Sequence, residues 1–264
     1  MRIVVKVGTS TLAHSTGRMN IRHVEELVKV LSDIKNAGHE VILVSSGAIG
    51  MGVGKLMLSG KPTDMPTKQA AAAVGQCELM YTYDRLFTQY NHTVAQILLT
   101  GEDVDHADRK ANFQNTLHRL LELGALPIIN ENDTVATAEI AVGDNDTLGA
   151  IVACSADADL LVLLSDIQGL YTADPRQDPN ARLIPVVKEV TEEVEALAGG
   201  AGSSLGTGGM ATKLRAAKMT TAAGVDMIIA NGEEPGILYD IVAGKPVGTR
   251  FLSKSKHSEG AYVC

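Results

Sequence analysis

The sequence has no tryptophan and few other aromatic residues, with six Tyr and three Phe in a chain of 264 residues. It also lacks a basic excess, because 23 Lys and Arg stand against 31 Asp and Glu, for a formal net charge of −8. Proteins that bind nucleic acids use clustered basic residues for the phosphates and aromatic rings for base stacking. The composition therefore argues against a nucleic-acid partner.

Long hydrophobic runs and paired cysteines are missing as well. Apolar runs such as "LLVLL" at 160–164 are far shorter than the ~20 residues that span a bilayer. The start, "MRIVVKVGTS", has no cleavage pattern typical of a signal peptide. Cys77, Cys154 and Cys264 are scattered and form no C-x-x-C pair, which indicates reduced thiols. We therefore expect a cytoplasmic protein without a membrane span.

Apolar strand patterns alternate with helical patterns along most of the chain. The predicted strands are "RIVVKVG", "EVILVSSG", "TVAQILL", "ALPIIN", "DLLVLLSD" and "VDMIIA". Predicted helices run from Asn20, as N-cap, to Gly38, over 67–88 and 110–122, and after Asn145 and Gly209. Near-continuous apolar strands between helices are typical of a mainly parallel sheet covered on both faces. We expect an α/β fold, a three-layer αβα sandwich, as a single domain over residues 1–264.

Two lysines stand at unusual places, Lys6 inside a predicted strand and Lys213 in the first turn of a predicted helix. In open sheets of this type ligands bind beyond the carboxyl ends of the strands. Lys6 lies inside an apolar strand and is followed by Gly-Thr-Ser; it is either an edge lysine that reaches solvent or a ligand for phosphate. In "GTGGMATK", Gly208 and Gly209 precede a helix whose first N–H groups favour an anion, and Lys213 lies one turn in. A flexible loop with a solvated lysine is the alternative.

The stretch "GDNDTLGA" sets Asp144 and Asp146 on either side of Asn145. Alone, this pattern is most simply a solvated turn. With two candidate phosphate lysines at the same edge of the sheet, however, Asp146 can pair with both lysines. Asp133 and Asp144 then remain for the ammonium group of a ligand, while the Asn145 amide can both donate and accept hydrogen bonds. In "SSGAIGMG", Ser45, Ser46 and the glycines can face an anion such as a carboxylate, or the segment is only a tight strand–helix turn. Together these loops predict a pocket for ATP and a zwitterionic small acid.

The motifs "VVKVGTS", "VSSGAIGMG", "AAVGQ", "INENDTVATAEI", "VGDNDTLGA", "GLYTADPR" and "LGTGGMATKLRAA" resemble those of the glutamate 5-kinase family, in the amino-acid kinase superfamily. The resemblance covers about residues 2–248. It implies that ATP phosphorylates the γ-carboxylate of L-glutamate, the first step of proline biosynthesis. It also implies that Mg²⁺ is carried by ATP rather than by a metal site of the protein. A related kinase acting on aspartate or N-acetylglutamate is the alternative, or a catalytically silent amino-acid sensor.

The resemblance also implies roles for individual residues and regions. The transferred phosphoryl group would be handled by Lys6, Lys213 and Asp146, and glutamate would be bound by Ser46, Asp133, Asp144 and Asn145. The nucleotide would be bound by Lys6, Ser165, Asp166, Thr207, Gly208, Gly209, Met210, Ala211, Thr212 and Lys213. The amino acid would bind to the N-terminal part and the nucleotide to the part from about residue 160. We further expect a homo-oligomer (dimer or tetramer), feedback inhibition by L-proline, and no C-terminal PUA domain such as many relatives carry.

Overall fold

The computed structural model describes residues 1–14, 18–136, 142, 144–199 and 209–254 of the chain. Within these ranges, eight strands form one sheet in the order β3-β4-β2-β1-β5-β7-β8-β6. The strands are β1 (Arg2–Val7), β2 (Glu40–Ser45), β3 (Val94–Leu99), β4 (Leu126–Glu131), β5 (Leu160–Ser165), β6 (Val186–Val187), β7 (Asp226–Asn231) and β8 (Thr249–Phe251). All neighbours pair in parallel except β7 and β8. The predicted, mainly parallel sheet is confirmed.

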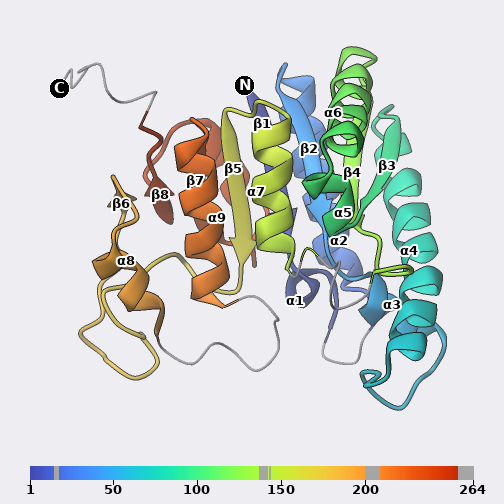
Figure 1. The fold of residues 1–264 in the computed structure, drawn as a ribbon, viewed down its shortest axis with the longest axis horizontal. Helices are drawn as coiled ribbons and strands as arrows, with labels where there is room; N and C mark the ends of the chain where they lie inside the picture. The colour runs from blue at the N-terminus through green and yellow to red at the C-terminus, as the bar shows by residue number, and fades with distance from the viewer. Residues whose placement is uncertain (15–17, 137–141, 143, 200–208, 255–264) are drawn as a thin grey trace.

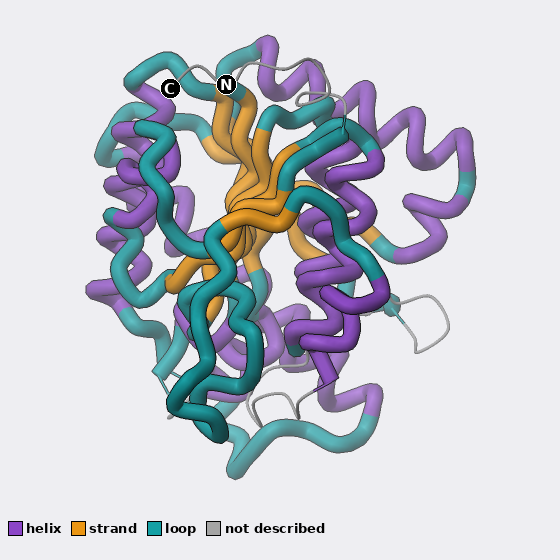
Figure 2. The backbone as a smooth tube through the Cα atoms, turned by 90° about the vertical axis from the view of Figure 1, so that its left-hand side faces the viewer, coloured by secondary structure: helices purple, strands orange, loops and turns teal. Residues whose placement is uncertain are grey.

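Helices cover both faces of this sheet, as Figures 1 and 2 show. They are α1 (Thr9–Leu12), α2 (Ile21–Asn36), α3 (Ala48–Lys55), α4 (Met65–Thr88), α5 (Gly101–Asp105), α6 (Ala107–Glu122), α7 (Asn145–Ser155), α8 (Glu192–Ala196), α9 (Met210–Ala222) and α10 (Ile237–Val242). Buried side chains of α2, α4 and α10 form one core with the sheet, and those of α6, α7 and α9 form another. Three layers result, as expected for an αβα sandwich.

Strand β1 shows how the alternation of side chains places the site. Ile3, Val5 and Val7 face the core that contains α2, whereas Val4 faces the core that contains α7. Because side chains alternate along a strand, Lys6 lies on the same face as Val4. The Lys6 Cβ is 3.5 Å from where a Cβ would lie at Gly149 of α7. The lysine therefore runs beneath α7 toward the carboxyl end of β1.

The expected helices are present with small shifts in their ends. Helix α2 starts after Asn20, whose side chain accepts a hydrogen bond from the His23 amide at 3.3 Å. Past its end, Gly38 has a φ of 92°, a conformation that glycine adopts at little cost. The remaining predicted helices correspond to α4, α6, α7 and α9, and α4 and α6 begin two to three residues earlier than expected. Among the described helices, none combines the length and the apolar character needed to cross a membrane.

Helix α3, with the glycine-rich sequence "AIGMGVGK", was not among the predicted helices. It forms because its glycines let it approach α4 closely. A Cβ at Gly52 would lie 1.8 Å from the carbonyl oxygen of Ala71, and one at Gly75 would lie 1.7 Å from that of Ala48. The backbones of the two helices thus touch directly, and tertiary packing outweighs the low helix propensity of glycine.

Candidate active site

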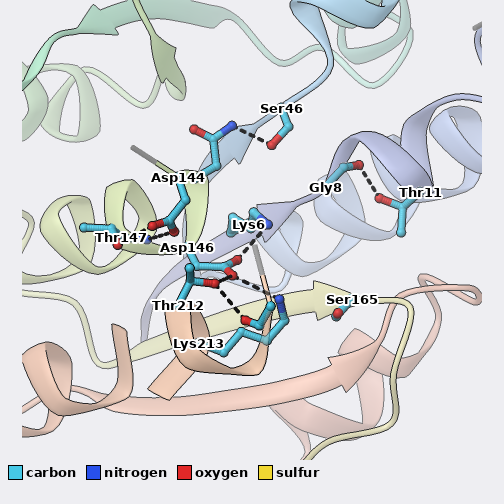
Figure 3. Close-up of polar contacts among 12 residues, drawn as sticks. Lys6, Gly8, Thr11, Ser46, Asp144, Asp146, Thr147, Ser165, Thr212 and Lys213 are labelled. Carbon is cyan, nitrogen blue, oxygen red and sulfur yellow. Dashed lines mark hydrogen bonds and ion pairs between the residues drawn. The ribbon is translucent and has the colours of Figure 1, made fainter. Parts of the chain in front are cut away.

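Asp146 is the centre of a charged cluster at the carboxyl ends of the strands (Figure 3). It is the second residue of α7, and only 1% of it is exposed. Its Oδ1 lies 2.7 Å from the Lys6 Nζ, and its Oδ2 lies 3.0 Å from the Lys213 Nζ. The Thr212 hydroxyl also donates to Oδ2, at 2.8 Å. One carboxylate therefore joins β1, α7 and α9.

Burial and charge act on Asp146 in opposite directions. Burial by itself raises the pKa of this carboxyl, but Lys6 and Lys213 outweigh that effect and lower the pKa to about 2. The group is ionised throughout the neutral range and holds both ammonium groups in place. The structure thus brings together the three residues that the sequence assigned to the transferred phosphoryl group, and their role there remains a prediction.

The start of α9 is built to receive an anion. Gly209 is its N-cap, with Met210 and Ala211 in the first turn, so the first amides of the helix point out of its end. The Thr212 hydroxyl, besides its bond to Asp146, donates to the Gly209 carbonyl at 2.8 Å. Lys213 and Lys6 lie beside this helix end (Figure 3). Thr207 and Gly208, also expected at the nucleotide, lie outside the described residues.

Ser165 and Asp166 lie at the carboxyl end of β5, at the same edge of the sheet as the charged cluster. Ser165 ends β5 between β1 and β7, and its hydroxyl donates to the Asp166 carboxylate at 3.0 Å. Figure 3 shows Ser165 on the side of the cluster where Lys213 lies. Both residues are therefore close in the fold to the start of α9, the other half of the expected nucleotide site.

A chain of hydrogen-bonded side-chain amides runs from Gln96, on the edge strand β3, to Ser46. The Asn145 amide donates to the Ser46 hydroxyl at 2.5 Å and to the Asn130 side-chain oxygen at 3.3 Å. Asn130 in turn donates to Gln76 at 3.0 Å, and Gln76 donates to Gln96 at 3.2 Å. Ser46 and Asn145 were expected together. The other three residues were missed, although Asn130 and Gln76 lie in the quoted motifs "INEN" and "AAVGQ".

Three acidic residues lie near this amide chain. Asp144 caps α7, since its carboxylate accepts hydrogen bonds from the Thr147 amide and hydroxyl, both at 2.8 Å. It thus has a structural task in addition to the ligand contact expected of it. The pKa of Asp133 is raised to about 6, mainly by burial and further by the negative charge of Glu131.

Glu131 was not anticipated from the sequence. It accepts a hydrogen bond from the Val142 amide at 2.7 Å, and burial, followed by the nearby Asp144, raises its pKa. Among the described residues, neither Asp133 nor Glu131 takes part in an ion pair. This acidic group is therefore suited to a cation such as an ammonium group.

Comparison with known proteins identifies the family of the chain. Residues 1–231 match the model of the amino acid kinase family. The chain is 53% identical to a glutamate 5-kinase from Clostridium perfringens over 257 residues, which cover 96% of each chain. It is 54% identical to one from Carboxydothermus hydrogenoformans, covering 97% of this chain and 68% of that protein.

Solved structures support the same fold at low identity. Carbamate kinase from Giardia lamblia bound to AMP-PNP superposes with a TM-score of 0.69 at 16% identity, over 95% of this chain and 98% of the other. UMP kinase from Bacillus anthracis gives 0.66 at 17% identity, over 96% of each chain. On these findings the chain belongs to the amino acid kinase family, in the group of the glutamate 5-kinases.

Proposed function

We propose that this chain transfers the γ-phosphoryl group of ATP to the side-chain carboxylate of L-glutamate. The product, L-glutamyl 5-phosphate, is the first intermediate of proline biosynthesis. The observation that carries the chemistry is the pair of buried lysines on Asp146, beside the N-terminus of α9. The choice of glutamate is supported by relatives at 53–54% identity that bear the name glutamate 5-kinase.

The reaction needs no general base. A glutamate side chain has an ordinary pKa of ~4.3, so at neutral pH its carboxylate is already the nucleophile. Asp146, with its pKa near 2, is a poor proton acceptor. Its role is to hold Lys6 and Lys213, which stabilise the negative charge on the phosphoryl group as it moves. Catalysis then depends on alignment and charge stabilisation, as is usual for phosphoryl transfer.

The two substrates would occupy the two halves of the strand edge. The first turn of α9, with Lys6 and Lys213, would bind the phosphates, and Ser165 and Asp166 would contact the nucleotide. The amino acid would lie at Ser46 and Asn145. Its ammonium group would face Asp133 and Asp144, with Glu131 adding negative charge, and Asp144 keeps lone pairs beyond those that Thr147 uses. Residues before about 160 would thus bind the acid and later ones the nucleotide.

Mg²⁺ would enter with ATP and neutralise charge on its phosphate oxygens. Among the described residues, no group of three or more His, Cys, Asp or Glu side chains is placed to hold a metal ion. The two oxygens of Asp146, the acidic residue nearest the lysines, already accept bonds from Lys6, Lys213 and Thr212. The donor set therefore suits an ion held chiefly by the nucleotide.

We extend the proposal to regulation, assembly and location. L-Proline carries the same α-carboxylate and a positively charged nitrogen as glutamate, and is proposed as an inhibitor of the same chain. The chain is further proposed to form a homo-oligomer, a dimer or a tetramer, and to act in the cytoplasm. Inhibition is measured by titrating proline against glutamate, and assembly by light scattering.

The test is ATP-dependent acyl-phosphate formation, trapped with hydroxylamine, with glutamate, aspartate and N-acetylglutamate as acceptors. Product from glutamate alone is expected. The acidic group at Asp133 and Glu131 favours a free ammonium over an acetylated nitrogen, and the preference over aspartate rests on the relatives named glutamate 5-kinase. Product from aspartate or N-acetylglutamate instead would keep the phosphate site but overturn the assigned substrate. ATP binding without product from any acid would indicate a sensor.

A further inference from the structure

Tyr83 and Ser45 form a buried pair that the proposed chemistry does not use. Tyr83 lies on α4 and Ser45 ends β2, and both are 0% exposed. The Tyr83 hydroxyl lies 2.8 Å from the Ser45 Oγ, and that Oγ donates to the Ser46 carbonyl at 3.2 Å. A serine hydroxyl has one hydrogen, so when Ser45 gives it to the Ser46 carbonyl, the hydrogen of the Ser45–Tyr83 bond comes from Tyr83. Burial raises the pKa of Tyr83 well above its usual range, which keeps it protonated as a donor.

This pair fixes the peptide that joins Ser46 to Gly47. The Ser46 amide is bonded to the Val7 carbonyl at 3.1 Å, and its carbonyl is held by Ser45. In a trans peptide the C=O and N–H groups point in opposite directions. With the Ser46 carbonyl turned toward the Ser45 hydroxyl, the Gly47 N–H points away from Ser45. Gly47, with a φ of 105°, would otherwise allow this peptide to rotate.

Helix α4 also contacts the backbone directly after Gly47. A Cβ at Gly75 would lie 1.7 Å from the Ala48 carbonyl oxygen, so the backbone of α4 lies directly against the first turn of α3. The neighbouring Gln76 is bonded to Asn130, which accepts from Asn145. Helices α3 and α4 run side by side in Figure 1. Tyr83 therefore acts from a helix that is already tightly docked.

We propose that Tyr83 and Ser45 are positioning residues that orient the Ser46–Gly47 peptide toward the carboxylate substrate. The inference rests on the proposed function for its kinetic test. Since the pair lies on the acid side of the site, far in the fold from the start of α9, its loss is expected to affect the acid and not ATP.

The experiment compares Tyr83→Phe, Ser45→Ala and the double variant with the unmodified chain. Loss of a net hydrogen bond corresponds to a fall of about five- to tenfold in kcat/KM for glutamate. The KM for ATP is expected to change by less than about twofold. Because both residues act through one carbonyl, the double variant is expected to lose no more than Ser45→Ala alone. The matched control is Ser32→Ala, since the Ser32 hydroxyl is buried on α2 without a hydrogen-bond partner among the described residues.

Hydrogen exchange provides a readout that needs no activity. The amides of residues 46–50 are expected to exchange faster in Tyr83→Phe than in Ser32→Ala at matched stability. Unchanged exchange, or a KM for ATP that rises as much as kcat/KM for glutamate falls, would overturn the positioning role. If the unmodified chain makes no product from glutamate, the proposed function fails, while the exchange result still decides the inference.

Discussion

Replacing Asp133 with Asn is expected to stabilise the protein and, at the same time, to weaken glutamate binding. Asp133 is partly buried and close to Glu131, and its pKa is raised from 3.8 to about 6. A raised pKa means that the folded state binds the proton more tightly than the unfolded state does. The ionised carboxylate at neutral pH therefore costs folding free energy, which is consistent with a group kept for binding rather than for stability.

The magnitude follows from the size of the pKa change. A shift from 3.8 to about 6 corresponds to about 3 kcal/mol at 1.36 kcal/mol per unit, and partial exposure reduces it to about 2–3 kcal/mol. The sign follows from linkage: this cost is fully present above pH 6, shrinks as the pH falls toward 3.8, and is absent below it. At pH 5 the gain from Asp133→Asn is expected to be about half of that at pH 8.

The assay is urea unfolding of both proteins at pH 5 and pH 8, together with glutamate KM at pH 8. The variant is expected to unfold at higher urea at pH 8, and its glutamate KM is expected to rise at least about tenfold, because a charged partner of the ammonium group is lost. The control is Asp84→Asn, on the exposed side of α4. It is expected to change neither the stability in urea nor the glutamate KM. Equal stability gains at pH 5 and pH 8, or a variant less stable than the parent at pH 8, would refute the reasoning.

Three further predictions concern the charged cluster. Lys213→Ala is expected to lower kcat by at least about a hundredfold with little change in glutamate KM; Lys218→Ala, whose ammonium pairs with Glu195 on the surface, is its control, and a rise in glutamate KM alone would show that the roles are exchanged. Asp146→Asn is expected to reduce the free energy of unfolding by about 2–4 kcal/mol in chemical denaturation, because two buried lysines lose their partner. Since the pKa of Asp146 is lowered to about 2, this difference should be constant above about pH 4 and should narrow only as the pH falls toward 2; a difference that changes between pH 6 and 8 would contradict it. Thr212→Val, which removes the hydroxyl on the Asp146 Oδ2, is expected to lower kcat about tenfold, and Thr212→Ser should restore it if the hydroxyl is what matters.

Much of the fold and of the charged cluster could be predicted from the sequence, because both depend on local sequence patterns. Residues three to four apart decide a helix and alternating residues decide a strand, so the main strands, the long helices and the Asn20 cap were predicted. The rule that ligands bind at the carboxyl ends of parallel strands then placed Lys6, Asp146 and Lys213 at one edge. A lysine in an apolar strand needs a partner, and Asp146 was the partner predicted and found.

Only the tertiary structure decided the contacts that join distant segments. The order of the strands and the helical state of the Gly-rich segment at Ala48–Lys55 depend on packing. The same holds for the bonds between Ser45 and Tyr83, 38 residues apart, and between Gln76 and Asn130, 54 residues apart. A buried hydroxyl or amide takes whichever partner the folded chain brings within about 3 Å. Such partners are set by how α4 packs on the neighbouring strands β2 and β4, which no local periodicity encodes.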